Sequence, residues 1–197
     1  MQRTFAFYFV MVQTPLKPIT LEDFLQRPET KPASEFIDGQ VIQKPMPKAA
    51  HSVIQGSLTT AINQALRSDK EACALPELRC AFDGVAIIPD ITVLPWELIP
   101  RDESGMINGD LLSPPTWMIE ILSPGQSQSK VVKKILHAID SGTEIGWLID
   151  PAEKCVFSYR PERIIELWEV SSETLPTPAF ASNFYLSVAE LVGWLYA

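Results

Sequence analysis

The chain has 197 residues, of which 46% are hydrophobic and 20% are charged. This composition is typical of a folded globular protein and excludes a disordered or fibrous one, and the length suits one compact domain. The net charge of −8 argues against binding nucleic acid through a broadly basic surface, because such affinity comes from Lys and Arg contacts to phosphates. One local cluster of positive charge interrupts the acidic balance, namely Lys130, Lys133 and Lys134.

The three cysteines, Cys73, Cys80 and Cys155, show no C-x-x-C spacing, and the chain has only two histidines to complete a zinc site. Neither a disulfide framework nor a thiolate metal site is therefore predicted. A reducing cytoplasm is the expected location.

Residues 1–18 are predicted to be an N-terminal extension of a domain that covers residues 19–197. The apolar run from Phe5 to Val12 is too short to span a bilayer, and no small-residue cleavage site follows it. We interpret it as a strand or a packed extension, or as a consequence of a start at Met11, rather than as an export signal.

In chain order, Thr20 and Asp23 form a capping box at the start of a short helix that runs toward Arg27. The Asp38-Gly39 pair lies between two apolar arms and predicts a β-hairpin over residues 35–42. Apolar residues at three- and four-residue spacings then predict a five-turn amphipathic helix from His51 to about residue 68.

The remaining chain alternates strands and helices, which predicts an α/β domain. Strand candidates between residues 72 and 94 are interrupted at Pro76, at Asp83-Gly84 and at Pro89. The later elements are a strand over 118–122, a helix over 127–139 with Ser127 as its N-cap, strands over 145–149 and 155–159, and a closing helix over 187–196.

Two of these strand segments each contain one carboxylate among apolar residues. Asp90 lies in the run from Ile88 to Val93, and Glu120 lies in the run from Trp117 to Leu122. Desolvating an unpaired carboxylate costs several kcal/mol, on the order of the whole stability of a domain, so each needs a partner. A divalent cation between neighbouring strands would supply one, and oxygen ligands suit Mg²⁺ or Mn²⁺.

A metal held by two carboxylates, with a lysine nearby, is suited to phosphodiester hydrolysis. Such a metal lowers the pKa of a bound water, and the lysine stabilises charge that develops on the phosphate. Structural roles compete with this interpretation: Asp90 could cap a turn, and the lysines of the 127–139 helix could form its solvated face.

The ordered set of motifs resembles a known family. Four motifs carry the resemblance, in this order: Pro89-Asp90, Glu120-Ile121-Leu122-Ser123-Pro124, the lysine-containing helix that leads to Gly142, and Trp147-Leu148-Ile149-Asp150-Pro151. The set is similar to the Uma-type family of proposed restriction-like endonucleases, a branch of the PD-(D/E)xK nuclease superfamily that is abundant in cyanobacteria. The upstream hairpin and His51 match as well, so the resemblance covers roughly residues 19–190.

The resemblance implies a restriction-endonuclease-like α/β fold: a mixed central sheet flanked by helices, with an N-terminal helix and β-hairpin. It implies Asp90 and Glu120 as metal ligands, Lys134 as the catalytic lysine with Lys130 as the alternative, and Glu35 as an extra acid near the metal. His51 is expected to be a local hydrogen-bonding residue.

In the superfamily motif the lysine lies two residues after the glutamate, where this chain has Leu122; the resemblance implies that relatives of this type carry the lysine on the following helix. Two positions depart from the pattern of relatives, since Ala138 and Gly146 replace a tyrosine and an aromatic residue. The implied activity is endonucleolytic hydrolysis of DNA with Mg²⁺ or Mn²⁺ by a homodimer, with no membrane partner. The alternative is a non-catalytic binding or assembly module with the same fold, favoured by the acidic balance and by Leu122.

Overall fold

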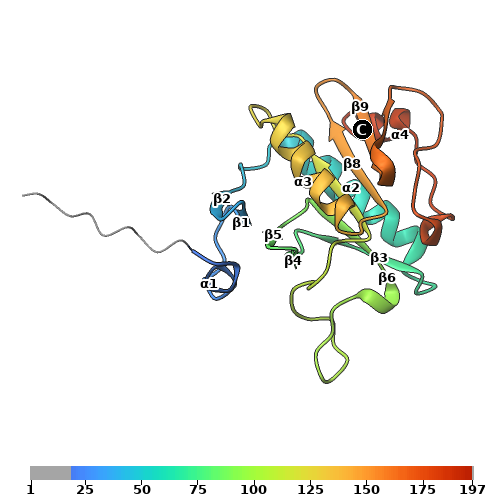
Figure 1. The fold of residues 1–197 in the computed structure, drawn as a ribbon. Coiled ribbons are helices and arrows are strands. Elements are labelled where there is room, and N and C mark those ends of the chain that lie inside the picture. Colours follow the sequence, from blue (N-terminus) through green and yellow to red (C-terminus); the bar gives the residue numbers. More distant parts are fainter. Residues whose placement is uncertain (1–18, 197) are drawn as a thin grey trace, which may run out of the picture.

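The computed structural model describes residues 19–196 (Figure 1). The predicted N-terminal extension, with the run from Phe5 to Val12 and the alternative start at Met11, lies outside the described residues. No helix within the described range is long and apolar enough to cross a membrane. All three cysteines are buried and carry free thiols.

Four short strands form a small antiparallel sheet with the order β2-β1-β5-β4. Its members are β1 (Ser34–Ile37), β2 (Gln40–Gln43), β4 (Cys80–Phe82) and β5 (Val85–Ile87), and α1 (Leu21–Leu25) precedes them. The predicted Asp-Gly turn joins β1 to β2 with positive φ at both Asp38 (51°) and Gly39 (72°), as a tight hairpin turn requires. The predicted capping box of Thr20 and Asp23 is also present.

The main sheet has six strands in the order β10-β9-β8-β7-β6-β3. These strands are β3 (Ala72–Pro76), β6 (Ile91–Pro95), β7 (Trp117–Ile121), β8 (Ile145–Asp150), β9 (Cys155–Arg160) and β10 (Ile164–Trp168). In the described chain only β7 and β8 pair in parallel, and α3 (Gln128–Asp140) makes the crossover between them. Short 3-10 turns cover Trp96–Leu98, Pro161–Arg163 and Ala179–Ala181.

Helices cover the main sheet on both faces, so the core lies in two layers. On one face, α2 (Ala49–Leu66) and α4 (Val188–Gly193) pack with the C-terminal segment over side chains such as Ile91 and Ile119. On the other face, α3 packs over Met118 and Leu148. Figure 1 shows α1, β1 and β2 together on one side of the molecule.

The predicted mixed α/β fold is confirmed, with two differences in detail. The strand β10 was missed, because it is an edge strand whose Ile164, Ile165 and Leu167 are exposed, so no core pattern marks it. Ser127 stands at the N-cap position of α3, but its hydroxyl makes no capping bond and contacts Ser129 Oγ at 3.0 Å.

The structure explains why residue 146 is a glycine rather than an aromatic residue. A Cβ placed on Gly146 would lie 2.4 Å from Cγ2 of Ile135, a fully buried residue of α3. The missing side chain therefore allows α3 to approach β8 closely. Because a β-branched side chain is stiff at χ1, Ile135 could not yield without a shift of the helix.

We predict that Gly146→Ala lowers the free energy of unfolding by about 1–3 kcal/mol, the usual cost of overpacking a core. Gly56→Ala is the matched control, since Gly56 is exposed in α2 with open space around it and alanine favours the helix. Urea denaturation should show changes of opposite sign in the free energy of unfolding for the two substitutions. A Gly146→Ala protein as stable as the wild type would contradict the close approach of α3 to β8.

Candidate active site

The site begins with the register of two antiparallel strands, β6 and β7. Ile91 pairs with Ile119, so the next position of the same register sets Asp90 opposite Glu120. Residues opposite each other on neighbouring strands have Cβ atoms about 4.5–5.5 Å apart and share a face of the sheet. Both carboxylates thus lie on the face that α3 covers, and both are buried.

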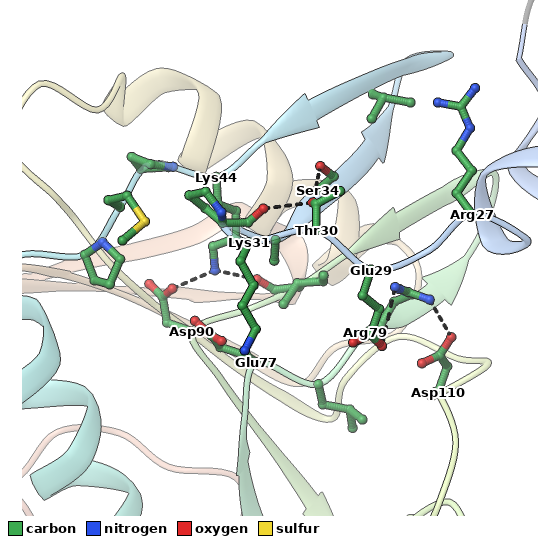
Figure 2. A pocket seen from close by; sticks show the side chains of 18 of the residues that line it. Arg27, Glu29, Thr30, Lys31, Ser34, Lys44, Glu77, Arg79, Asp90 and Asp110 are labelled. Atoms are coloured by element: carbon green, nitrogen blue, oxygen red, sulfur yellow. Dashed lines mark hydrogen bonds and ion pairs between the residues drawn. The ribbon is translucent and has the colours of Figure 1, made fainter.

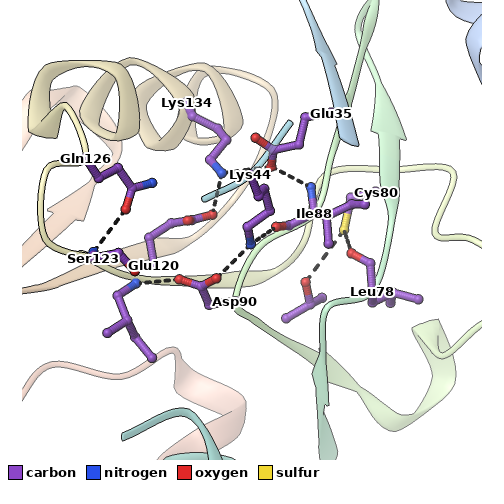
Figure 3. A network of polar contacts seen from close by, with 12 residues as sticks. Glu35, Lys44, Leu78, Cys80, Ile88, Asp90, Glu120, Ser123, Gln126 and Lys134 are labelled. Atoms are coloured by element: carbon purple, nitrogen blue, oxygen red, sulfur yellow. Dashed lines mark hydrogen bonds and ion pairs between the residues drawn. The ribbon is translucent and has the colours of Figure 1, made fainter. Parts of the chain in front are cut away.

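Asp90 is held by contacts to both of its carboxylate oxygens (Figure 3). Oδ1 lies 2.7 Å from Nζ of Lys44, and Oδ2 lies 3.1 Å from Nε2 of His51 and accepts a 2.7 Å hydrogen bond from the backbone N–H of Ile121. Burial alone would raise the pKa of Asp90, but Lys44 and His51 outweigh it and hold the pKa well below its usual range. Asp90 is therefore ionised.

Glu120 belongs to a second group of charges on the same side of the sheet. Nζ of Lys134 lies 2.9 Å from Oε1 of Glu120 and 2.8 Å from Oε1 of Glu35, which also accepts a 2.8 Å hydrogen bond from the Ile88 N–H. The Lys134 contact to Glu120 is an ion pair without hydrogen-bond geometry, so Oε1 of Glu120 is a buried oxygen with no hydrogen-bond partner. Figure 3 shows these side chains pointing toward one another.

The two lysines do not fully neutralise the cluster, since Asp90, Glu120 and Glu35 are three carboxylates. Burial lowers the pKa of Lys134, but Glu120, Glu35 and Asp90 outweigh it and raise that pKa above its usual value. Glu120 gains less from sharing Lys134: its burial, together with repulsion from Asp90, raises its pKa to about 7. Negative charge is thus in excess around Glu120.

A cleft of about 690 Å³ opens beside Asp90 (Figure 2). Lys44 and His51 line it together with Asp90, while the α1–β1 connection contributes Arg27 and Lys31. Its volume lies within the range typical of ligand-binding sites. Glu120 and Lys134 are not among the lining residues, so they lie behind the wall that Asp90 and Lys44 form.

The structure brings all four predicted site residues together, namely Asp90, Glu120, Lys134 and Glu35. Lys130 and Lys133 are exposed, so of the three clustered lysines only Lys134 is buried with the acids. His51 bonds Asp90, in agreement with the hydrogen-bonding role expected of it.

Sequence reasoning missed Lys44, which follows β2 directly. Its pairing with Asp90 spans 46 residues of sequence, and no local pattern predicts such a contact. The available signal was indirect: Pro45 follows Lys44 and fixes it in an extended conformation at the end of the hairpin.

Comparisons with known proteins agree with this geometry. The model of the Uma2 family, described as "Putative restriction endonuclease", matches residues 21–189. The chain belongs to the Uma2 family. The crystal structure of "a putative nuclease belonging to DUF820" from Anabaena variabilis is 49% identical to this Uma2 protein, with a TM-score of 0.88 over 90% of this chain and 99% of that one. Curated proteins give no match.

The residues of this Uma2 site fit the divalent cation that the nuclease fold implies. Carboxylate oxygens are the ligands of Mg²⁺ and Mn²⁺, Oε1 of Glu120 lacks a hydrogen bond, and the cluster has an excess of negative charge. Across residues 19–196 no group of three or more His, Cys, Asp or Glu side chains is arranged to hold a metal. A site with one or two carboxylates is nevertheless usual for Mg²⁺, which takes its other ligands from water and substrate phosphates.

We predict that, in metal-free buffer, Glu120→Gln gains stability relative to the wild type as the pH rises from 5 to 8. The folded-state pKa of Glu120, about 7, lies above its ordinary value of 4.5. Ionisation is therefore less favourable in the folded protein, so the wild type loses stability as the pH rises through this window. The variant has no carboxyl to ionise and escapes that loss.

Urea denaturation with EDTA at several pH values measures the difference. Glu103→Gln is the control, because Glu103 is exposed and its carboxyl stays in water. A stability difference for Glu120→Gln that stays constant or turns against the variant with rising pH would contradict an excess of negative charge at Glu120.

Proposed function

We propose that this protein is an endonuclease that hydrolyses DNA phosphodiester bonds with Mg²⁺ or Mn²⁺. The observation that carries the proposal is the β6–β7 register, which sets Glu120 opposite Asp90, a residue that lines a cleft. Membership in a family described as restriction endonucleases supports the reaction class. A bound Mg²⁺ or Mn²⁺ would lower the pKa of a water molecule and offset charge on the phosphate.

Different residues of the chain would bind the cation and hold its ligands in position. Asp90 and Glu120 would bind the cation through their carboxylates. The Ile121 N–H and His51 orient Asp90 from one side. Lys134 keeps Glu120 and Glu35 in place by a charge contact to each.

His51 contacts Asp90 through Nε2, and its Nδ1 is a buried nitrogen with no hydrogen-bond partner among the described residues.

The competing function is a non-catalytic binding or assembly module. The observation that favours it is the pairing of Asp90 with Lys44 and of Glu120 with Lys134, because these ammonium groups already give each carboxylate a cation. The two functions differ in metal binding: an enzyme must exchange at least one of these contacts for a divalent cation.

We further propose that the enzyme acts as a homodimer, since cutting both strands of a duplex in one encounter requires two sites. Twofold symmetry is the most common arrangement of soluble oligomers and matches the symmetry of duplex DNA. The three buried free thiols agree with action in a reducing cytoplasm.

The test of the proposed function is cleavage of supercoiled plasmid DNA in Mn²⁺, Mg²⁺ or Ca²⁺ at low salt. We expect cleavage with the first two metals and little with Ca²⁺, whose loose coordination orients water poorly. Asp90→Asn should abolish both cleavage and the Mn²⁺-induced rise in melting temperature, whereas Asp69→Asn, at an exposed position, should preserve both. Intact DNA and RNA under all conditions, with Mn²⁺ binding that does not depend on Asp90, would favour the module.

A second experiment separates Lys134 from Lys130. Lys134→Ala leaves two buried carboxylates without their shared cation, which typically costs about 3–5 kcal/mol of unfolding free energy, and turnover should fall by on the order of a hundredfold. Lys130→Ala removes an exposed charge and should change stability by less than about 0.5 kcal/mol. The reverse pattern, measured by urea denaturation and single-turnover cleavage, would reassign the lysine.

A further inference from the structure

Lys44 is the residue of the cluster that the expected site did not include, and the fold fixes it firmly. Its backbone N–H donates to the Ala33 carbonyl at 2.8 Å, which continues the β1–β2 ladder by one residue pair. Pro45 follows and restricts the backbone to an extended form. The side chain therefore leaves the hairpin from a defined position, and only 11% of it is exposed.

The ammonium group of Lys44 has two hydrogen-bond partners among the described residues. Nζ donates to the Ile88 carbonyl at 2.6 Å and to Oδ1 of Asp90 at 2.7 Å. A lysine ammonium carries three donors, so one N–H has no partner among residues 19–196. Since Lys44 lines the cleft beside Asp90, this donor is available to a molecule that occupies the cleft (Figure 2).

Lys134 differs from Lys44 in this respect. It contacts Glu35 and Glu120, is 5% exposed along its side chain, and does not line the cleft. Figure 3 shows Lys134 pointing toward Glu120 and Glu35, and Lys44 pointing toward Asp90. Of these two lysines, Lys44 alone lines the cleft.

The cleft presents further cations along the path that leads to Lys44. Arg27 and Lys31 are exposed on its wall and form no ion pair with any residue of the range 19–196, whereas Arg79 is paired with Asp110 and Glu29. Unpaired cations beside a ligand-sized cleft suit a phosphodiester backbone, whose affinity for proteins comes largely from such contacts.

We propose that Lys44 is a catalytic residue that contacts the scissile phosphate directly, with its free N–H donating to a non-bridging phosphate oxygen. This inference rests on the proposed function, because it names the residue that meets the substrate of that same site. Lys134 then acts behind it as a positioning residue for Glu120. Lys44 and Asp90 together place a donor and a metal-binding carboxylate at one end of the cleft.

The test uses Lys44→Met, which removes the charge and keeps a long side chain, with Lys133→Met as the control at an exposed position of α3. The probes are fluorescein-labelled 20-nucleotide DNAs, single-stranded and duplex, in Ca²⁺, so that binding is measured without cleavage. Single-turnover cleavage in Mn²⁺ is measured in parallel. Melting temperatures report folding, and Lys44→Gln replaces Lys44→Met if the latter unfolds, because an amide can still donate to Asp90 and Ile88.

For Lys44→Met we expect binding about tenfold weaker, a salt dependence reduced by close to one phosphate contact, and cleavage slower by on the order of a hundredfold. Lys133→Met should match the wild type, and Lys44→Arg should recover part of the binding. The proposal is overturned if the folded Lys44 variants bind and cleave like Lys133→Met, or if the wild type binds neither DNA.

The two proposals fail separately. If the wild type cleaves DNA and Lys44→Met cleaves it equally well, the nuclease stands and the role of Lys44 is wrong. If no protein cleaves DNA in any metal while Lys44→Met still loses binding and one unit of salt dependence, the nuclease is wrong and the phosphate contact of Lys44 stands.

Discussion

Three buried carboxylates share two lysine ammonium groups, and the arrangement of the N-terminal half depends on this sharing. Removing one partner of a buried charge pair typically costs about 3–5 kcal/mol, a large part of the stability of a domain of this size. The partners come from distant elements: Lys134 of α3 contacts Glu35 of β1 across 99 residues of sequence. The site contacts therefore also fasten the small β1–β2 sheet to the main sheet.

The same lysine contacts allow the acidic site to be stable when no metal is bound. Two carboxylates on adjacent strands repel each other when no cation is present. Burial and this repulsion raise the pKa of Glu120 by more than Lys134 lowers it, so the pKa stays above its ordinary value. On the proposed mechanism, Asp90 would hold a divalent cation together with Glu120, and Lys44 beside Asp90 would contact the substrate phosphate. The same ionic groups would stabilise the free enzyme and, in a different set of contacts, the phosphate that reacts.

The sequence pointed to the site residues that interrupt an apolar strand pattern. A carboxylate inside an apolar strand is anomalous, which is why Asp90 and Glu120 stood out, whereas Lys134 was implied by the family resemblance. Lys130 remained an alternative because it lies one turn away on the same face, and only packing separates the two. Lys44 could not be predicted, since its role arises from a contact between a hairpin end and a strand start that no spacing encodes.

Leu122 explains why the positive charges of the site come from other elements than β7. Two residues after Glu120, a side chain at the strand end would lie on the same face as the carboxylate, where a lysine of the superfamily pattern belongs. Here an apolar side chain packs at that position against the α3 side of the core. The positive charges must then come from other elements, and the structure supplies them from α3 and from the end of β2. Charge at the site thus depends on the docking of both elements, so loosening either one would disturb the acids before it disturbed the sheet.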